Sequence, residues 1–221
     1  SLGGGPLDPE DIPTGQMPDE YFAAWAVDQL EHTHQKPFFM AVGFVRPHVP
    51  FTAPRKYFEM YDPEKIQIPR GPQNDLKDTP LIARANAMGL LEKGDHQVVT
   101  EMGEKYWKML VHSYLACTTF VDAEIGRVLN ALEKSRYSDN TLVLLTTDHG
   151  QHLGEKPRWR KMSLWETATR VPLMVSFPNG LYAGRTTNEA VSLISLPPTH
   201  VDLAQHHPPA HNHALSLNPS L

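Results

Sequence analysis

One continuous apolar stripe constrains the fold of this chain more than any other feature. Between about Glu101 and Glu133, apolar side chains recur in steps of three and four, which predicts one long amphipathic helix. The stripe consists of Tyr106, Leu110, Tyr114, Cys117, Val121, Ile125, Val128 and Leu132. A helix with such a face must bury it against a sheet or against other helices.

Three short apolar runs have the length of strands. They are PFFMAVGFV from Pro37 to Val45, TLVLLTT before Asp148, and VPLMVSFP from Val171 to Pro178. Near-continuous apolar runs are typical of strands that are covered on both faces. The order strand, long helix, strand therefore predicts an α/β fold with a layered sheet, and parallel pairing is the first expectation.

The rest of the chain is read from turn and helix signals. Residues 1–18 are rich in Gly, Pro and Asp and predict a loop, and Asp19 to His34 has the spacing of an amphipathic helix. RPHVPFTAP carries three prolines and predicts a stiff, extended loop without a ladder. Residues from Arg55 to about Gln97 form a long, mostly polar connection. Within it, only a short helix around Leu81 to Leu91 is expected.

The composition favours one globular domain and excludes several classes of protein. The chain has 221 residues, of which 40% are apolar and 20% charged, and its net charge of −5 gives no reason to expect a nucleic-acid partner. No run approaches the ~18 apolar residues of a membrane-spanning helix. A single cysteine, Cys117, excludes an internal disulfide framework and fits a core residue. The start at Ser1 is interpreted as internal, either processed or truncated.

The end of the chain is rich in histidine and proline. Residues 199–221 are expected to be irregular or loosely packed. A metal-binding role is the less favoured alternative, because no helical pair supports it. The histidines are His200, His206, His207, His211 and His213.

Asp148 and His149 follow the second apolar run directly. In open α/β sheets, ligands bind at the carboxyl ends of strands. An Asp carboxylate is a hard oxygen ligand for a divalent cation, and a His can bind a metal or donate to an anion. Asp is equally common as a turn or helix-capping residue, so spacing alone leaves both readings open.

Two further segments contain candidate site residues. His48 stands between two prolines after the first apolar run. It is either an exposed loop residue without a functional role or a preorganised proton donor. Lys156 to Pro172 contains five basic residues interleaved with two tryptophans, which indicates a local anion pocket or a solvated loop. The five are Lys156, Arg158, Arg160, Lys161 and Arg170.

Four segments resemble the type I sulfatases, and most closely the iduronate-2-sulfatase-like group. They are KPFFMAVGFVRPHVPF, YLACTTFVDAEIGRVLNALE, NTLVLLTTDHGQHLGEK and WRKMSLWETATRVPLMV, in the order found in the family. The resemblance extends from about Pro13 to Phe177 and weakens beyond. It is specific to the sulfatase and alkaline phosphatase-like fold and much less specific to one sugar substrate.

The resemblance implies an α/β/α sandwich around a mixed, mostly parallel sheet, here incomplete, and the hydrolysis of sulfate esters of a small molecule or glycan with a bound calcium ion. Asp148 would be a calcium ligand, and His149 would bind the metal or contact the sulfate. His48 would bind the sulfate or protonate the leaving oxygen. Lys161 would neutralise the sulfate oxygens in the transition state.

The sequence also departs from the family pattern. It lacks the Cys/Ser-x-Pro-x-Arg motif that yields the formylglycine nucleophile, the N-terminal pair of aspartate ligands, and the small C-terminal subdomain. Residues 1–221 are thus predicted to be part of a catalytic domain that is inactive alone. The family would place the protein in the periplasm, outside the cell or in a lysosome. A phosphomonoester or phosphonate-ester hydrolase on the same fold, and a non-catalytic paralogue, remain as alternatives.

Overall fold

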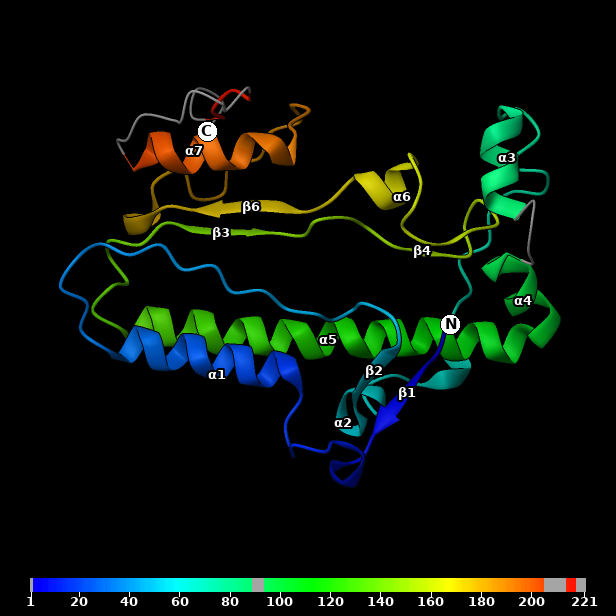
Figure 1. Ribbon diagram of the computed structural model, residues 1–221, viewed down its shortest axis with the longest axis horizontal. Coiled ribbons are helices and arrows are strands. Elements are labelled where there is room, and N and C mark those ends of the chain that lie inside the picture. Colours follow the sequence, from blue (N-terminus) through cyan, green and yellow to red (C-terminus); the bar gives the residue numbers. More distant parts are fainter. Residues whose placement is uncertain (1, 89–93, 205–213, 218–221) are drawn as a thin grey trace. The chain divides into compact units, whose positions relative to one another are not determined.

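The computed structural model describes residues 2–88, 94–204 and 214–217, which form two compact units. The first unit comprises Ser1–Ser138 with His149–Arg170, and the second comprises Asp139–Asp148 with Val171–Leu221. The helices of the first unit are α1 (Pro18–Glu31), α2 (Arg55–Phe58), α3 (Leu81–Met88), α4 (Asp95–Met102), α5 (Glu104–Lys134) and α6 (Glu166–Thr169) (Figure 1). Its strands are β1 (Gly4–Leu7), β2 (Phe51–Pro54), β4 (His152–Leu153) and β5 (Trp159–Arg160). The second unit contains β3 (Val143–Thr146), β6 (Leu173–Ser176) and α7 (Leu196–Leu203).

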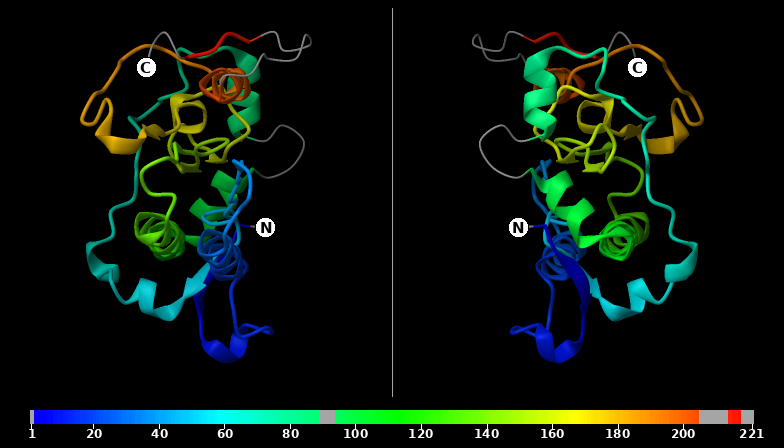
Figure 2. Two further views of the ribbon diagram at one scale, coloured as in Figure 1. Left: turned by 90° about the vertical axis from the view of Figure 1, so that its left-hand side faces the viewer. Right: turned by 90° about the vertical axis from the view of Figure 1, so that its right-hand side faces the viewer.

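The predicted long helix is confirmed as α5, and it organises the first unit. It begins at Glu104 rather than near Glu101, because Gly103 with φ 92° separates it from α4. The buried face includes Leu110, Cys117 and Phe120, which lie in one apolar core with Phe51 of β2. The predicted amphipathic helix is confirmed as α1, which packs beside α5 (Figures 1 and 2).

The prediction of irregular structure at the amino terminus and after the first apolar run is wrong in one respect. β1 lies within residues 1–18 and pairs in parallel with β2, which lies within the proline-rich segment. The ladder is possible because Pro54 occupies the last position of β2, where a missing N–H group costs little. Phe51 and Ala53 point into the core, so the pair is fixed by packing on α5.

The first apolar run does not form the predicted strand. Residues 37–45 run along α1 and α5 as an extended trace that is not assigned as a strand (Figure 1). Their side chains alternate between half-buried and exposed, and Phe39 is 77% exposed. The residue pattern of a strand is present, but strand assignment requires a hydrogen-bonded neighbour.

In the second unit, the other two apolar runs are confirmed as strands, but their direction differs from the prediction. β3 and β6 pair antiparallel, with Val143 opposite Ser176 and Thr146 opposite Leu173. Neither strand is covered on both faces, since β3 is half-buried and β6 alternates between half-buried and exposed residues. An apolar run carries no information about strand direction, so the α/β class was predictable and the pairing was not.

The remaining predictions have mixed outcomes. The polar connection contains α3 as expected and also α2 and the start of α4, which the sequence pattern did not reveal. The prediction of an irregular, loosely packed end is wrong for residues 199–203, which form the second half of α7 with Thr199 buried. This helix includes His200, whereas the other four histidines lie outside the described residues. That 1–221 is a single catalytic domain stays a prediction. No helix among the described residues is long and apolar enough to cross a membrane.

Candidate active site

His48 lies in a tight turn rather than on an extended loop. Its backbone N–H donates to Val45 O at 2.9 Å, and its ring Nδ1 lies 2.8 Å from Val49 O. A carbonyl oxygen only accepts, so Nδ1 carries the hydrogen and Nε2 is the acceptor in the neutral ring. The turn therefore determines which ring nitrogen is directed outward.

Two charged side chains hold the backbone around this turn. The fully buried carboxylate of Asp19, near the start of α1, accepts from the backbone N–H groups of Val45 at 2.5 Å and Arg46 at 3.3 Å. The Arg46 guanidinium spans the turn: its Nε donates to Thr52 O at 2.6 Å and its Nη2 to Thr52 Oγ1 at 2.8 Å. The segment carrying His48 is thereby tied to α1 and β2.

Lys161 follows directly on a short hairpin. β4 and β5 pair antiparallel, with His152 opposite Arg160 and Leu153 opposite Trp159. The indole N–H of Trp107 on α5 donates to Leu153 O at 2.7 Å, and so anchors the hairpin to the long helix. The connection between β4 and β5 lies equally close to the long helix, since a Cβ atom at Gly154 would lie 2.0 Å from Trp107 Cζ2.

The structure brings His48 and Lys161 into contact. Lys161 Nζ lies 2.8 Å from His48 Nε2, although the two residues are 113 positions apart in the sequence. Because Nε2 is the acceptor of the neutral ring, the lysine ammonium donates this hydrogen bond. An ammonium beside an imidazole at an exposed position can bind an anionic oxygen and move a proton.

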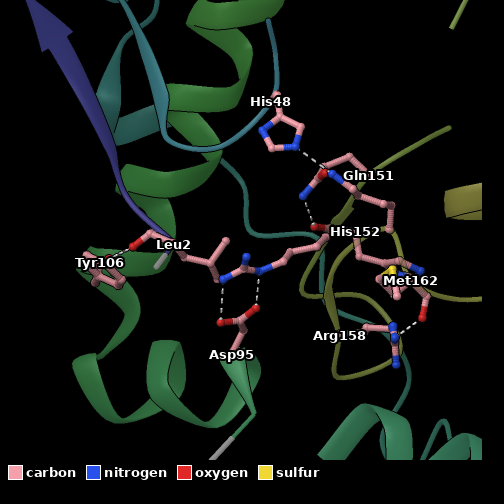
Figure 3. Close-up of polar contacts among 10 residues, drawn as sticks. Leu2, His48, Asp95, Tyr106, Gln151, His152, Arg158 and Met162 are labelled. Carbon is pink, nitrogen blue, oxygen red and sulfur yellow. Dashed lines mark hydrogen bonds and ion pairs between the residues drawn. The ribbon is translucent and has the colours of Figure 1, made fainter. Parts of the chain in front are cut away.

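The other basic residues of this segment have structural partners. Lys156 Nζ lies 2.7 Å from Asp75 Oδ1 and 4.7 Å from the centroid of the Trp165 ring. Arg160 makes a bidentate contact with the Asp95 carboxylate through Nε and Nη2. Arg158 donates to the Met162 carbonyl (Figure 3). Directly after α6, the exposed Arg170 faces Glu166 at 3.7 Å. Lys161 is therefore the member of the cluster best suited to an anion site.

Asp148 and His149 lie just beyond β3, where the sequence pattern put them. Asp148 is exposed and accepts from Thr147 Oγ1 at 3.4 Å, and His149 Nδ1 lies 2.8 Å from Gly150 O. The Nδ1 hydrogen is thereby assigned, which makes Nε2 the nitrogen that can bind a metal.

The donor set fits a calcium ion only in part. Calcium takes six to eight oxygen ligands, and Asp148 offers a carboxylate of the required type whereas an imidazole is an unusual partner. Among the described residues, no group of three or more His, Cys, Asp or Glu side chains is arranged to hold a metal ion. A calcium site that uses Asp148 would need further ligands.

Cys117 is confirmed as a core residue. It is fully buried on α5, and this burial raises the pKa of its thiol to about 12. A thiol with so high a pKa is neither a nucleophile nor a metal ligand near neutral pH.

Sequence reasoning missed the residues that hold the two candidate side chains in place. Asp19 is a helix residue by pattern, and Asp95 belongs to a polar connection that carries no motif. His152 is fully buried and its Nε2 lies 2.8 Å from Ser163 Oγ. The available signal was weak: His152 stands between Gln151 and Leu153 just before a Gly-Glu turn, and its partner is eleven residues away.

Comparison with known proteins identifies the family. Residues 4–206 match the sulfatase family, and the chain belongs to it. It is 40% identical to a sulfatase of Formosa agariphila over 91% of this chain and 39% of that protein. It is 33% identical to the iduronate 2-sulfatase of Mus musculus over 90% of this chain and 42% of that protein. The resemblance seen in the sequence is thus confirmed, and the chain spans less than half the length of these relatives.

Solved structures show the same fold. BT4656 in complex with its substrate D-glucosamine-2-N,6-O-disulfate matches with a TM-score of 0.76 and 22% identity, over 92% of this chain and 51% of that one. A phosphonate monoester hydrolase from Silicibacter pomeroyi matches with a TM-score of 0.66 and 29% identity, over 98% of this chain and 43% of that one. The α/β fold of the alkaline phosphatase-like class is therefore confirmed.

Proposed function

We propose that the protein containing this chain hydrolyses sulfate esters, with Lys161 and His48 acting on the sulfate group. The observation that carries the proposal is the 2.8 Å contact between Lys161 Nζ and His48 Nε2. Family membership supports it independently, since it rests on residues 4–206 as a whole rather than on this pair.

The chemistry of the pair suits a sulfate ester. The Lys161 ammonium would bind an anionic oxygen and stabilise the charge that builds up as the S–O bond breaks. After Nε2 of His48 takes up a proton and Lys161 turns to the sulfate, His48 would donate that proton to the leaving oxygen and so prevent the departure of an unstabilised alkoxide. The attacking group is not among these two, and we place the formylglycine expected for the family outside this chain.

A calcium ion at Asp148, with His149 as a second ligand or a sulfate contact, is part of the same proposal. When bound, calcium supplies positive charge that polarises the sulfur centre and lowers the pKa of an attacking hydroxyl. The carboxylate of Asp148 and its exposure at the end of β3 support this role. For the substrate we propose a sulfated carbohydrate, because iduronate 2-sulfatases and the glucosamine-disulfate complex are among the similar proteins.

The test uses the protein encoded by the parent reading frame. Hydrolysis of 4-nitrophenyl sulfate and of sulfated uronic-acid oligosaccharides is measured in wild type, Lys161→Ala, His48→Ala and the control Lys65→Ala. We expect kcat/KM to fall by about 10²–10³ for Lys161→Ala and by about 10²–10⁴ for His48→Ala. Lys65, which is 84% exposed in its pair with Asp62, should tolerate the change. A wild-type protein that carries formylglycine and cleaves no sulfate ester would refute the proposal.

Calcium dependence is tested separately. Removal of divalent ions with a chelator should abolish turnover, and calcium should restore it more fully than magnesium. Asp148→Asn should raise the calcium concentration needed for half-maximal activity, whereas the exposed control Asp28→Asn should not. Full activity of the metal-free enzyme would remove calcium from the proposal.

A phosphonate monoester hydrolase is the second candidate, because the Silicibacter pomeroyi enzyme matches 98% of this chain at 29% identity. The comparison is direct: turnover of 4-nitrophenyl phenylphosphonate and 4-nitrophenyl phosphate is measured beside the sulfate esters. A higher kcat/KM for the phosphonate would make this the main activity. The absence of turnover on all three substrates would favour a non-catalytic sulfatase homologue.

A further inference from the structure

We propose that His152 and Ser163 are positioning residues that hold Lys161 against His48. Their effect on catalysis rests on the proposed function, whereas their effect on the place of Lys161 does not. Figure 3 shows His152 and His48 in the same cluster of polar contacts as Met162, which follows Lys161.

The contact between His152 and Ser163 is buried and short. His152 lies on β4 with no exposed surface, and its Nε2 is 2.8 Å from Ser163 Oγ. Burial lowers the pKa of the His152 ring, and this effect exceeds the opposing influence of Glu155. The ring is therefore neutral near pH 7 and shares an uncharged hydrogen bond with the hydroxyl of Ser163.

The hydrogen bond between His152 and Ser163 completes a ring of contacts that includes the backbone of Lys161. On one side, the β4–β5 ladder pairs His152 with Arg160, the residue before Lys161. On the other side, Ser163 N donates to Lys161 O at 2.5 Å, and Ser163 Oγ returns to His152. The backbone of Lys161 is thus held from both directions by the same buried histidine.

The β4–β5 hairpin, which precedes Lys161, is fixed to helices α4 and α5. Arg160 Nε and Nη2 contact Asp95 of α4 at 2.5 and 3.2 Å, and Trp107 of α5 binds the backbone of Leu153. These contacts end at residue 160. Apart from the contact of Lys161 with His48, residues 161–163 are held by the short His152 contact, by the hydrogen bond from Arg158 to the Met162 carbonyl, and more weakly by Trp165 N, which lies 3.4 Å from Ser163 Oγ. Loss of the His152 contact or of the Arg158 hydrogen bond should let Lys161 move away from His48.

The first experiment measures the chemical reactivity of Lys161 and needs no enzymatic activity. The full protein is labelled briefly with an amine-acylating reagent, and the labelling of Lys161 relative to the exposed Lys65 is read by mass spectrometry. In wild type the ammonium is engaged with His48, which slows acylation. Ser163→Ala removes the hydrogen bond with His152 and the longer one that Ser163 Oγ accepts from Trp165 N at 3.4 Å, and it should raise relative labelling by about fivefold. Ser163→Thr, which keeps the hydroxyl, should behave as wild type.

Two further variants keep this result interpretable. Thr169→Ala is the matched control, because Thr169 is a nearby exposed residue whose hydroxyl donates to Trp165 O at 3.2 Å, away from Lys161. His152→Leu removes the other partner of the hydrogen bond and should raise the labelling of Lys161 as Ser163→Ala does. Unchanged labelling of Lys161 in Ser163→Ala, or an equal rise in Thr169→Ala, would overturn the proposal.

The second experiment tests whether Ser163 acts through Lys161. With a sulfate ester, Ser163→Ala should lower kcat/KM by about fivefold in the wild-type background and should cause no further loss in the Lys161→Ala background. Equal losses in both backgrounds would show that Ser163 acts independently of Lys161 and would refute the positioning role. A wild-type protein without sulfatase activity would refute the proposed function alone, since the labelling result still decides the inference.

Discussion

Among the basic residues that follow Glu155, the nature of each partner determines what the charge can do. Lys156 and Arg160 contact the carboxylates of Asp75 and Asp95, so their positive charges are balanced locally. Lys161 contacts a neutral imidazole, which does not cancel its charge. This difference, rather than the number of basic residues, is why Lys161 is the candidate for an anion site.

At the same scale, the burial of Cys117 leads to a prediction about its thiol. With a pKa raised to about 12, Cys117 should not react with a thiol reagent such as DTNB in the native protein and should react fully after denaturation. Cys117→Ser places a hydroxyl in the apolar core and should lower the free energy of unfolding by about 1–3 kcal/mol. Cys117→Ala is the control for lost volume alone. Rapid labelling of the native thiol would contradict the burial described here.

The buried His152 and the half-buried His96 predict how stability depends on pH. Burial lowers the pKa of His152 and His96 below the ordinary value of 6.5, so protonation favours the unfolded chain. Between 6.5 and the lower folded values, the unfolded state binds more protons, and stability therefore rises with pH through this window. The melting temperature should fall when the pH is lowered from neutrality, and less steeply in His152→Leu. An identical slope in that variant would count against a lowered pKa of His152.

At the scale of elements, α5 connects most of the first unit. It packs against α1 and β2, anchors the hairpin through Trp107, and carries Cys117 in the core. The hairpin also requires a glycine at position 154, because this residue adopts φ +121° directly against the Trp107 ring. The hairpin that leads to Lys161 is therefore anchored by an aromatic contact between two elements.

Two glycine substitutions test the importance of the contact with Trp107, and they should change the stability of the protein in opposite directions. Gly154→Ala combines an unfavourable φ with a Cβ atom 2.0 Å from Trp107 Cζ2, and it should cost about 1–3 kcal/mol or more of stability and reduce activity. Gly126→Ala lies inside α5 with nothing within 4 Å of the added Cβ, and it should gain about 0.5–1 kcal/mol. Denaturant unfolding measures both changes. Equal effects of the two substitutions would show that the aromatic contact is unimportant.

At the scale of the whole molecule, a large amount of apolar surface is exposed. Residues 37–45 are extended, and Phe39 and Val45 in this segment are exposed. Leu164, beside the candidate site, is 96% exposed. Exposed apolar side chains favour association with another chain.

The 221-residue chain made by itself should therefore associate. Light scattering after size-exclusion chromatography should show oligomers at micromolar concentration, and Phe39→Lys should shift the population toward monomer. Leu81→Lys is the matched control, since Leu81 on α3 is also 77% exposed but lies outside the extended segment. A monomeric wild-type chain with a single cooperative melting transition would refute this prediction.

What the sequence by itself determined is local. The stripe of α5, the helix α1 and the apolar runs of β3 and β6 were predictable because helix and strand periodicities repeat within a few residues. Asp148, His149, His48 and Lys161 could be selected as candidates because short motifs resemble a family that the comparisons confirm. The calcium site and the roles of these residues stay predictions.

Only the tertiary structure decided which distant residues meet. It paired β1 with β2 and turned β3 against β6, and it brought Lys161 to His48 and Ser163 to His152. Residue spacing along the chain cannot specify these contacts, because each depends on the burial of surfaces that come together only when the elements pack. Residues 37–45 illustrate the same point, since their apolar pattern predicts a strand and the folded chain holds them as an extended segment that is not one.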